Sequence, residues 1–320
     1  MGRTHGAVSI FGNRAFINKR KISEWVIMRI GIIGGGSIGL LIGSYLSSRH
    51  QVTMYVRNEQ QKESLNHKGI RRADASGKAM VQALLSNELS NEDCFIVCVK
   101  QGHIADIVPL LALVNKDTPV VFLQNGMGHL QAIKSIEQPI LLGVVDHGAL
   151  KSGHHTITQL GKGSIRVAAF SNADERIKGL VDAFHQLEFP VYMETDWSKL
   201  LTEKLIVNAV INPITALFDT KNGAIIHNRY LNALAKRLCE EAALILQLDP
   251  SKQWERIKQV ANNTTENTSS MLKDLKEKRE TELEAITGYL IQVNNDHWIP
   301  NTLFVYHSVK ALEVKKGIID

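Results

Sequence analysis

The sequence predicts a two-domain protein, with an α/β first part around a mainly parallel sheet and an all-α second part. Two observations lead to this prediction. Up to about Glu194, short β-branched and aliphatic runs alternate with longer helical periodicities, which is typical of βαβ units. After about Thr195 the strand pattern stops, and only helical periodicities follow. We therefore expect one domain over residues 28–195 and a second over 196–320.

The first domain is expected to begin with strands and helices in alternation. Strands are expected at residues 29–33, 51–56, 94–100 and 119–125, and helices at 37–48, 58–69 and 104–114. Three further apolar segments, at 139–150, 155–160 and 164–170, are interpreted as antiparallel additions to the sheet, followed by a helix near 174–187. In the second domain, helices are expected at 197–217, 230–248, 254–262, 276–294 and 301–316.

Composition is that of a globular protein, with 44% hydrophobic and 22% charged residues. The formal net charge of +5 fits an anionic ligand without specifying one. No basic run with interleaved aromatic residues indicates nucleic-acid binding. We find no apolar run of the roughly 18 residues that a membrane helix needs.

Cysteine and histidine usage also limits the function classes. Cys94, Cys98 and Cys239 form no disulfide framework, which favours a reducing cytoplasm. The histidines lack metal-ligand spacing, so no metal site is predicted. Residues 1–27 lack the apolar block of a signal peptide. We set them apart as an extension that is either disordered or the product of an upstream start codon, because a strand opens at Met28.

A glycine-rich motif follows the first expected strand and opens the first expected helix. It comprises Gly34, Gly35, Gly36, Ser37, Ile38 and Gly39, with the spacing G-x-G-x-x-G. The glycines at these spacings allow a tight turn, the approach of a pyrophosphate to the backbone and close packing of helix on strand. The helix N-terminus then favours the negative phosphates. This context favours dinucleotide binding in a Rossmann-type domain over a merely glycine-rich turn.

Polar residues at three strand ends are further candidates. Arg57 stands where NAD-binding proteins usually carry an acidic residue, and its guanidinium suits the 2′-phosphate of NADPH, although nearby Glu59 leaves NAD open. Lys100 and Asn125 each close another strand. Open sheets bind ligands outside such strand ends. A solvated strand-end charge at Lys100 and a plain Asn-Gly turn at Asn125 are the alternatives.

The segment 203–213, "EKLIVNAVINP", contains a lysine and two asparagines within an otherwise mainly apolar expected helix. Lys204, Asn208 and Asn212 are four residues apart and form one slanted stripe about 12 Å long. Buried polar groups are costly without partners, and a desolvated ammonium has a lowered pKa and can act as a proton donor. We interpret the stripe as a substrate-facing wall. The alternative is a structural contact with water or with the other domain.

Two segments of the second domain could complete this wall. Ser269 and Ser270 stand at the entry to an expected helix, either as a helix cap or as donors to a carboxylate. Glu282 lies in a charged segment, and its local pattern alone is that of a solvated helix face.

Together these motifs resemble the ketopantoate reductase (2-dehydropantoate 2-reductase) family. The resemblance runs over residues 28–316 with the motifs in family order, and the Lys-Asn-Asn helix is far more specific than the glycine loop. The motifs are "GIIGGGSIG", "VKQ", "LQNGMG", "KLIVNAVINPITAL", "KNG", "SSMLKD" and "RETELEAITGYL". The fold implied is a Rossmann-type domain followed by an all-α domain like the C-terminal domain of 6-phosphogluconate dehydrogenase.

The resemblance implies NADPH-dependent reduction of 2-dehydropantoate to pantoate, in pantothenate and coenzyme A biosynthesis. It implies catalytic roles for Lys204, as general acid, and for Glu282. The implied cofactor contacts are Gly34 to Gly39, Arg57, Lys100, Asn125 and Glu282. The implied substrate contacts are Lys204, Asn208, Asn212, Asn222 and Ser270, in a cleft between the domains.

Two other functions stay open at this point. A related NADP-dependent 2-hydroxyacid or opine-type dehydrogenase explains the glycine loop equally well, but gives no reason for the Ser270 and Glu282 segments. A non-catalytic NADPH-sensing protein would be expected to have lost Lys204 or Glu282. The sequence does not decide the oligomeric state, and we carry a homodimer as a hypothesis.

Overall fold

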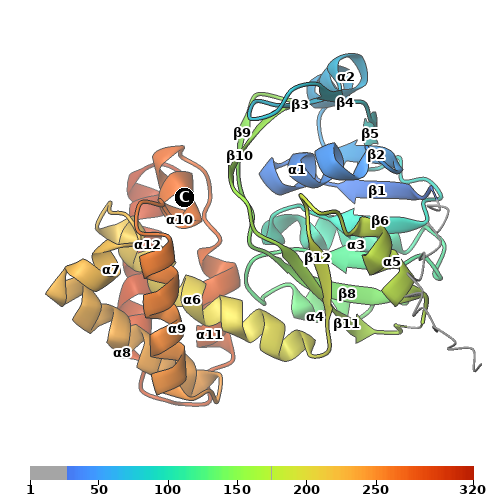
Figure 1. Ribbon diagram of the computed structural model, residues 1–320. Coiled ribbons are helices and arrows are strands. Elements are labelled where there is room, and N and C mark those ends of the chain that lie inside the picture. Colours follow the sequence, from blue (N-terminus) through green and yellow to red (C-terminus); the bar gives the residue numbers. More distant parts are fainter. Residues whose placement is uncertain (1–26, 174) are drawn as a thin grey trace, which may run out of the picture.

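The computed structural model describes residues 27–173 and 175–320. The expected extension, residues 1–27, therefore lies outside the described part except for its last residue. The described chain contains a sheet-based part and a helical part side by side (Figure 1). The expected fold class, an α/β domain followed by an all-α domain, is confirmed.

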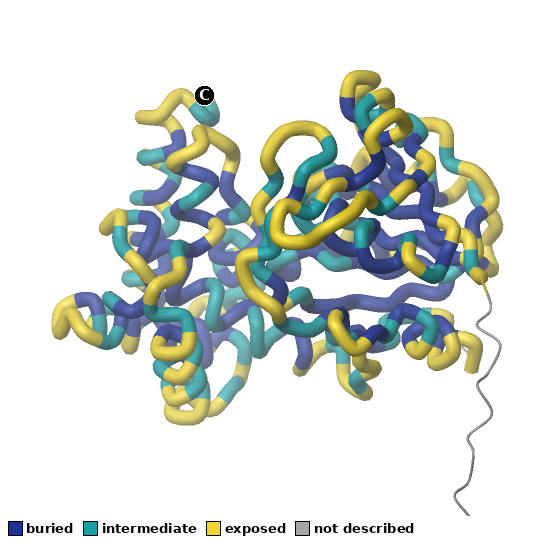
Figure 2. Tube along the Cα trace, turned by 45° about the horizontal axis from the view of Figure 1, so that its top comes forward, coloured by how far each residue is buried: buried dark blue, intermediate teal, exposed yellow. Residues whose placement is uncertain are grey.

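An eight-stranded sheet forms the centre of the first part, in the order β12-β11-β8-β7-β6-β1-β2-β5. Its strands are β1 (Arg29–Ile33), β2 (Gln51–Val56), β5 (Gln82–Leu85), β6 (Cys94–Val97), β7 (Val120–Phe122), β8 (Ile140–Val145), β11 (Ile165–Ser171) and β12 (Val191–Glu194). The six neighbouring strands β8, β7, β6, β1, β2 and β5 all pair in parallel. Figure 2 shows these central strands as buried, because helices and loops cover both faces.

The antiparallel interpretation of residues 139–170 was only partly right. β8 pairs in parallel with β7 and thus continues the main sheet, whereas β11 is antiparallel to β8. The intervening residues leave that sheet. They form β9 (Gly148–Ser152) and β10 (Thr156–Gly161), which join β3 (Ile70–Arg72) and β4 (Lys78–Ala79) in a second, four-stranded sheet. Apolar alternation alone does not distinguish one sheet from another.

The second sheet packs against α1 (Ser37–Leu46), the helix that follows the glycine motif (Figure 1). The other helices of this part are α2 (Glu59–Lys68), a short 3-10 turn (Gln101–His103), α3 (Ile104–Leu111), α4 (Leu130–Ile133) and α5 (Arg176–Phe184). Asn58 caps α2, with its side chain accepting a hydrogen bond from the Gln61 backbone at 2.8 Å.

The second part is helical throughout. It contains α6 (Trp197–Leu217), α7 (Ala224–His227), α8 (Arg229–Ile245), α9 (Pro250–Asn263), α10 (Ser270–Lys276), a π-helix (Glu284–Gly288), α11 (Tyr289–Gln292) and α12 (Pro300–Lys315). The expected continuous helix over 276–294 was wrong. The chain leaves α10 after Lys276 and enters helix again only at Leu283, with Lys278 at a φ of 52°.

Helix α6 connects the two parts. Asp196 caps its start, accepting from the Lys199 backbone at 3.0 Å, and Pro213 does not end it. It packs on β8 and β11 as well as on α8, α9, α10 and α12. By length and composition α6 could cross a membrane, contrary to our expectation for the sequence, but 72% of its apolar window is buried inside the fold. Its apolar surface is therefore explained by the protein core.

Candidate active site

The carboxyl ends of five parallel strands lie along one edge of the main sheet. The glycine motif follows β1, Arg57 follows β2, and Lys100 lies three residues after β6. Asn125 follows β7 at the same edge, and Asp146 follows β8. In open α/β sheets this edge is where ligands bind.

The glycine loop has the backbone that a dinucleotide requires. Gly34 has a φ of +114°, which a side chain would strain. A Cβ on Gly39 would lie 1.9 Å from the Gly34 carbonyl oxygen. Helix α1 can therefore pack against the loop only because glycine lacks a Cβ atom. A Cβ on Gly36 would meet nothing within 4 Å, and no side chain caps this end of α1. An uncapped helix N-terminus facing open space fits a bound pyrophosphate.

Lys100 is held between the two parts of the molecule. Its Nζ donates to Asp274 Oδ2 of α10 at 3.0 Å and to the Glu280 carbonyl at 2.6 Å. Asp274 is buried and also accepts from Arg279 Nε at 2.9 Å. Lys100 is thus not merely a solvated strand-end charge. Arg57, by contrast, is exposed and donates to His103 Nε2 at 2.8 Å.

Asn125 and Glu282 make a second bridge between the parts. The Asn125 side chain donates to Glu282 Oε2 at 2.8 Å. Next to it, the Met127 backbone donates to the Ala285 carbonyl at 3.0 Å, and Gly126 has a φ of +79°. Burial raises the pKa of Glu282, although the Asn125 hydrogen bond and the charge of Lys100 act in the opposite direction. Glu282 is therefore not the solvated residue that its charged segment indicated.

Lys204 lies where α6 passes the end of β8. Its ammonium donates to the Val145 carbonyl and lies 3.8 Å from Asp146 Oδ1. Burial lowers the pKa of Lys204, while the charges of Asp146 and Glu282 act to raise it. Asp146 is in turn 3.4 Å from Arg166. The ammonium is thus partly desolvated and close to the carboxylate of Asp146, and the desolvation shifts its pKa in the direction that suits a proton donor.

The two amides of the stripe are less constrained. Asn208 is half-buried and Asn212 is buried, and within the described residues neither side chain has a hydrogen-bond partner. One turn beyond Asn212, Thr215 Oγ1 donates to Ser269 Oγ at 2.8 Å. This contact brings the start of α10 to the end of the stripe.

Ser269, and not Ser270, caps α10, accepting from the Leu272 backbone at 3.2 Å. Ser270 is the first residue of that helix and is exposed, so its hydroxyl is not used by the cap. Asn222 lies beside the same loop, with its backbone N–H donating to the Asn267 carbonyl at 3.0 Å. Its Nδ2 donates to Thr264 Oγ1 at 2.9 Å, but its buried Oδ1 has no partner among the described residues.

Three charged residues near this edge escaped the sequence prediction. They are Asp146 beside Lys204, Asp274 beside Lys100, and Lys151, which donates to the Gly35 carbonyl at 2.9 Å. Asp146 had a usable signal, because it directly follows an apolar strand. That signal was lost when residues 139–150 were interpreted as an antiparallel addition. The other two depend on contacts between segments far apart in the sequence.

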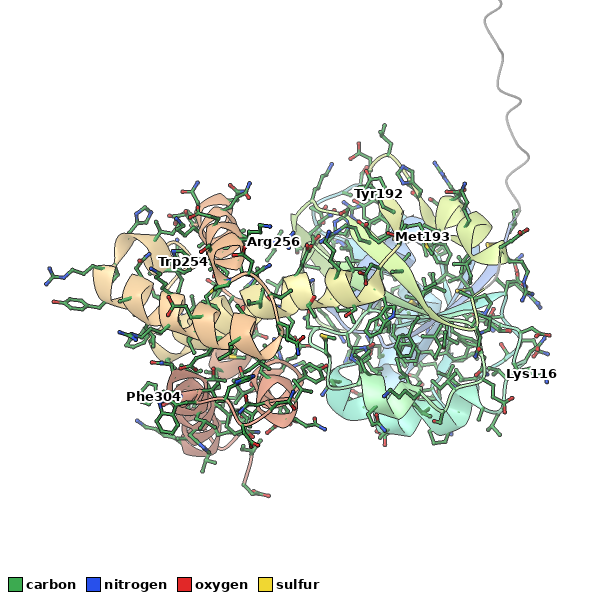
Figure 3. The ribbon with its side chains drawn as sticks, turned by 90° about the horizontal axis from the view of Figure 1, so that it is seen from below. Lys116, Tyr192, Met193, Trp254, Arg256 and Phe304 are labelled. Atoms are coloured by element: carbon green, nitrogen blue, oxygen red, sulfur yellow. The ribbon has the colours of Figure 1, made fainter. Side chains whose placement is uncertain are left out.

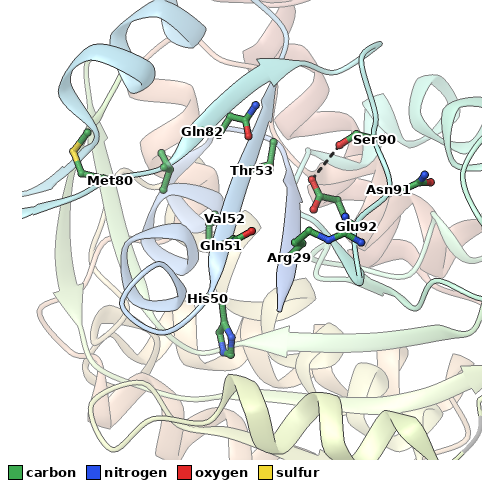
Figure 4. Close-up of a pocket in the computed structure, with 11 residues that line it drawn as sticks. Arg29, His50, Gln51, Val52, Thr53, Met80, Gln82, Ser90, Asn91 and Glu92 are labelled. Carbon is green, nitrogen blue, oxygen red and sulfur yellow. Dashed lines mark hydrogen bonds between the residues drawn. The ribbon is translucent and has the colours of Figure 1, made fainter. Parts of the chain in front are cut away.

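A hollow of about 590 Å³ elsewhere does not belong to this site. It opens near the amino-terminal ends of β1 and β2, where Arg29, His50 and Gln51 line it (Figure 4). Its one buried carboxylate, Glu92, already accepts from the Tyr55 hydroxyl at 2.8 Å. Within residues 27–173 and 175–320, no three His, Cys, Asp or Glu side chains gather to hold a metal ion.

The fold and site define a class: a two-domain protein with a Rossmann-type glycine loop, whose sheet edge meets a polar stripe on a core helix. The model of the family "Ketopantoate reductase PanE/ApbA" matches residues 30–172, and that of its C-terminal part matches residues 196–313. The chain belongs to this ketopantoate reductase family.

Individual relatives agree with this assignment. A 2-dehydropantoate 2-reductase of Bacillus subtilis is 39% identical over 299 residues, covering 89% of this chain and 98% of the relative. One of Vibrio cholerae is 30% identical, covering 89% and 98%. A crystal structure of a probable 2-dehydropantoate 2-reductase of B. subtilis has a TM-score of 0.82 at 40% identity, covering 89% and 99%. D-mandelate dehydrogenase with NADH shares the fold, with a TM-score of 0.84 at 20% identity, covering 91% and 99%.

Proposed function

We propose that the protein reduces 2-dehydropantoate to pantoate with NADPH, a step of pantothenate and coenzyme A biosynthesis. The observation that carries this proposal is the position of Lys204. Its ammonium lies at the junction of the two parts, at the carboxyl end of β8. Lys204 and Glu282 lie near enough for each charge to affect the pKa of the other group. The family and the relatives support the choice of substrate.

The residues at the sheet edge fit a nicotinamide dinucleotide. When bound, NADPH supplies the hydride that reduces the C2 carbonyl of the substrate. The glycine loop, residues 34–39, would hold the pyrophosphate at the start of α1, and Arg57 would pair with the 2′-phosphate. We assign Lys100, Asn125 and Glu282 to the same ligand, because they join β6 and β7 to the helical part at this edge.

In this proposal Lys204 is the general acid. Its ammonium donates a proton to the C2 oxygen as negative charge develops there, and stabilises that charge before the proton moves. Partial desolvation favours proton release, while Asp146 and Glu282 keep the ammonium form populated. Since Lys204 now donates to the Val145 carbonyl, it must exchange this partner for the substrate oxygen.

The substrate is held by the remainder of the wall. Asn208 and Asn212 offer amides without other side-chain partners in the described chain, and Asn222 offers a carbonyl oxygen. Ser270, with the first N–H groups of α10, is suited to the substrate carboxylate. Fixing the carboxylate and hydroxyl groups in register would hold C2 in a reactive orientation.

Three further points belong to the proposal. We divide the chain between residues 195 and 196, between the end of β12 and the start of α6.

We place the protein in the cytoplasm, since Cys94, Cys98 and Cys239 are free thiols. We propose a homodimer; a structural relative from Staphylococcus aureus is described as dimeric, and light scattering after gel filtration tests the same state here.

A spectrophotometric assay tests the function. NADPH oxidation is followed with 2-dehydropantoate, with pyruvate and with phenylglyoxylate, each also with NADH. We expect kcat/KM for 2-dehydropantoate with NADPH to exceed every other combination by at least about a hundredfold, since the wall must recognise polar groups that the other acids lack. Faster turnover of another 2-keto acid would contradict the substrate assignment and favour a related 2-hydroxyacid dehydrogenase.

A further inference from the structure

A lysine from the second sheet reaches the glycine loop. Lys151 lies on β9, and its Nζ donates to the Gly35 carbonyl at 2.9 Å. Its backbone N–H donates to Ser37 Oγ at 3.2 Å, at the start of α1. The side chain is half-buried. Lys151 is therefore a cation held directly beside the backbone that would bind phosphate.

The strand that carries Lys151 is held in place from both sides. Lys151 is paired in antiparallel register with Ile157 of β10, which is fully buried. At the turn between these strands, His154 accepts a hydrogen bond from Gln61 Nε2 at 2.9 Å through its carbonyl oxygen. The His155 ring lies 2.9 Å from Ser64 Oγ of α2. The ammonium is thus presented by a fixed backbone and not by a free loop.

Lys151 lacks a counter-charge in the described part of the chain. Its only side-chain partner there is the neutral Gly35 carbonyl, and no carboxylate lies within ion-pair distance. Arg57 likewise contacts a histidine and no carboxylate in that part. Burial lowers the pKa of Lys151, and the positive charge of Arg57 lowers it further. Two cations whose charges affect each other, and which have no acidic partner among the described residues, are unfavourable unless an anion binds near them.

The position of Lys151 favours contact with the phosphate on the adenosine ribose over contact with the pyrophosphate. Gln61 lies in the first turn of α2, the helix that follows the β2 end and Arg57, and it donates to the same Gly35 carbonyl as Lys151, at 2.8 Å. Lys151 therefore approaches the glycine loop on the side of the β2 end. That strand end is where dinucleotide-binding domains recognise the adenosine ribose, including its 2′-substituent.

We propose that Lys151 binds the 2′-phosphate of NADPH together with Arg57 and so helps to discriminate NADPH from NADH. This inference rests on the proposed function, because it takes NADPH as the cofactor. The guanidinium of Arg57 would bind the phosphate from the β2 end, and the ammonium of Lys151 from β9. The second sheet then contributes to cofactor choice, because its strand β9 holds Lys151 in position to bind the 2′-phosphate.

Equilibrium binding of four ligands to the full-length protein tests this inference without any turnover. The ligands are NADPH, NADH, 2′,5′-ADP and ADP, titrated calorimetrically into the unmodified protein and into Lys151→Met. We expect Lys151→Met to raise the Kd for NADPH and for 2′,5′-ADP about tenfold, the loss of one hydrogen bond to a charged group. The Kd values for NADH and ADP should change less than about twofold, because neither carries a 2′-phosphate.

Two variants separate charge from a structural role. Lys151→Gln keeps a donor for the Gly35 carbonyl but removes the charge, so it should weaken NADPH as much as Lys151→Met does. Lys151→Arg keeps the charge and should preserve at least part of the affinity. Lys162→Met is the matched control, since Lys162 follows β10 and is exposed with Glu188 as its partner. It should leave all four Kd values unchanged.

Two results would overturn the inference, and a third would overturn the cofactor assignment on which it rests. An equal loss of NADH and NADPH affinity in Lys151→Met would overturn the inference, because the lysine would then serve the pyrophosphate or the loop itself. Full recovery by Lys151→Gln would overturn it as well, in favour of a structural hydrogen bond. If the unmodified protein bound NADH as tightly as NADPH, the proposed cofactor would be wrong. That result is distinct from a failure at Lys151 alone.

Discussion

The glycine loop and the polar stripe of α6 solve different problems by different means. The loop works through backbone geometry: Gly34 has a positive φ, Gly39 lacks the Cβ that would collide, and α1 begins with uncapped N–H groups. The stripe works through side chains, as Lys204, Asn208 and Asn212 project from a helix whose other sides are mostly buried. The loop thus depends on the absence of side chains, and the stripe depends on three polar side chains.

This difference separates binding from chemistry. A backbone cradle provides affinity and orientation for a ligand that many enzymes share, but it holds no group that titrates near neutral pH. The stripe holds an ammonium whose pKa burial lowers and whose neighbours are carboxylates. We therefore expect changes in the loop to act on cofactor affinity, and changes around Lys204 to act on turnover and its pH dependence.

The largest effect on cofactor affinity is expected from adding one methyl group to the loop. In Gly39→Ala the new Cβ would lie 1.9 Å from the Gly34 oxygen, a backbone atom that cannot rotate away. Helix α1 must then shift from the loop, and we expect the Kd for NADPH to rise about a hundredfold or more, the effect of losing about two hydrogen bonds to a charged group. Fluorescence titration measures this change.

Gly179→Ala is the matched control for that methyl group. Gly179 lies on the exposed side of α5, and a Cβ there would meet nothing within 4 Å. We expect unchanged NADPH affinity and a gain in stability of about 0.4–1 kcal/mol, because alanine restricts the unfolded chain. If Gly39→Ala bound NADPH as well as this control, close packing at the loop would not be needed for binding.

A smaller and more specific effect is expected at Asp146. Its carboxylate helps to raise the pKa of Lys204 against burial, so Asp146→Asn should lower that pKa further. The protonated form of a general acid is active, and hence the alkaline limb of the kcat/KM profile should move to lower pH. The loss at pH 7 should be about fivefold or less, since Asp146 is 42% exposed and such pairs are weak.

Asp146→Glu should keep the alkaline limb near its original position, because it retains the charge. Steady-state rates between pH 6 and 10 measure both variants. An alkaline limb that moved equally in the Asn and Glu variants would argue for a packing role of Asp146 and against its action on Lys204.

Sequence reasoning was strongest where the signal is local. The G-x-G-x-x-G spacing and the four-residue stripe need only one loop or one helix, and the glycine geometry and the common helix of Lys204 and Asn212 follow from them. It was weaker where two distant segments meet. Neither the Lys100–Asp274 pair nor the Asn125–Glu282 hydrogen bond can be found from spacing, because 174 and 157 residues separate the partners.

Segments whose pattern is ambiguous account for the errors in the fold. Residues 139–161 contain one strand of the main sheet, β8, and two of the second sheet, β9 and β10, and nothing in the local pattern says which sheet each strand joins. Residues 276–294 carry helical composition throughout, yet the turn after Lys276 is needed to bring Glu282 to Asn125. In both places tertiary contacts override local propensity.

The helix that carries the stripe is also fixed from its outer side. Glu203, next to Lys204, pairs with Arg256 of α9 at 2.8 Å, and Figure 3 shows Arg256 beside α6 near the junction of the two parts. A substitution at Lys204 should therefore leave α6 in place. This makes Lys204 a suitable position for separating chemistry from binding.

Lys204→Ala, assayed for both turnover and NADPH binding, tests the central claim most directly. With 2-dehydropantoate at saturation we expect kcat to fall by about a thousandfold, the size of effect expected when a general acid is lost. The Kd for NADPH should stay within about twofold, because in this account the backbone of the glycine loop, and not Lys204, would hold that ligand. A variant that kept most of its turnover, or that lost NADPH affinity as severely as Gly39→Ala, would contradict the account.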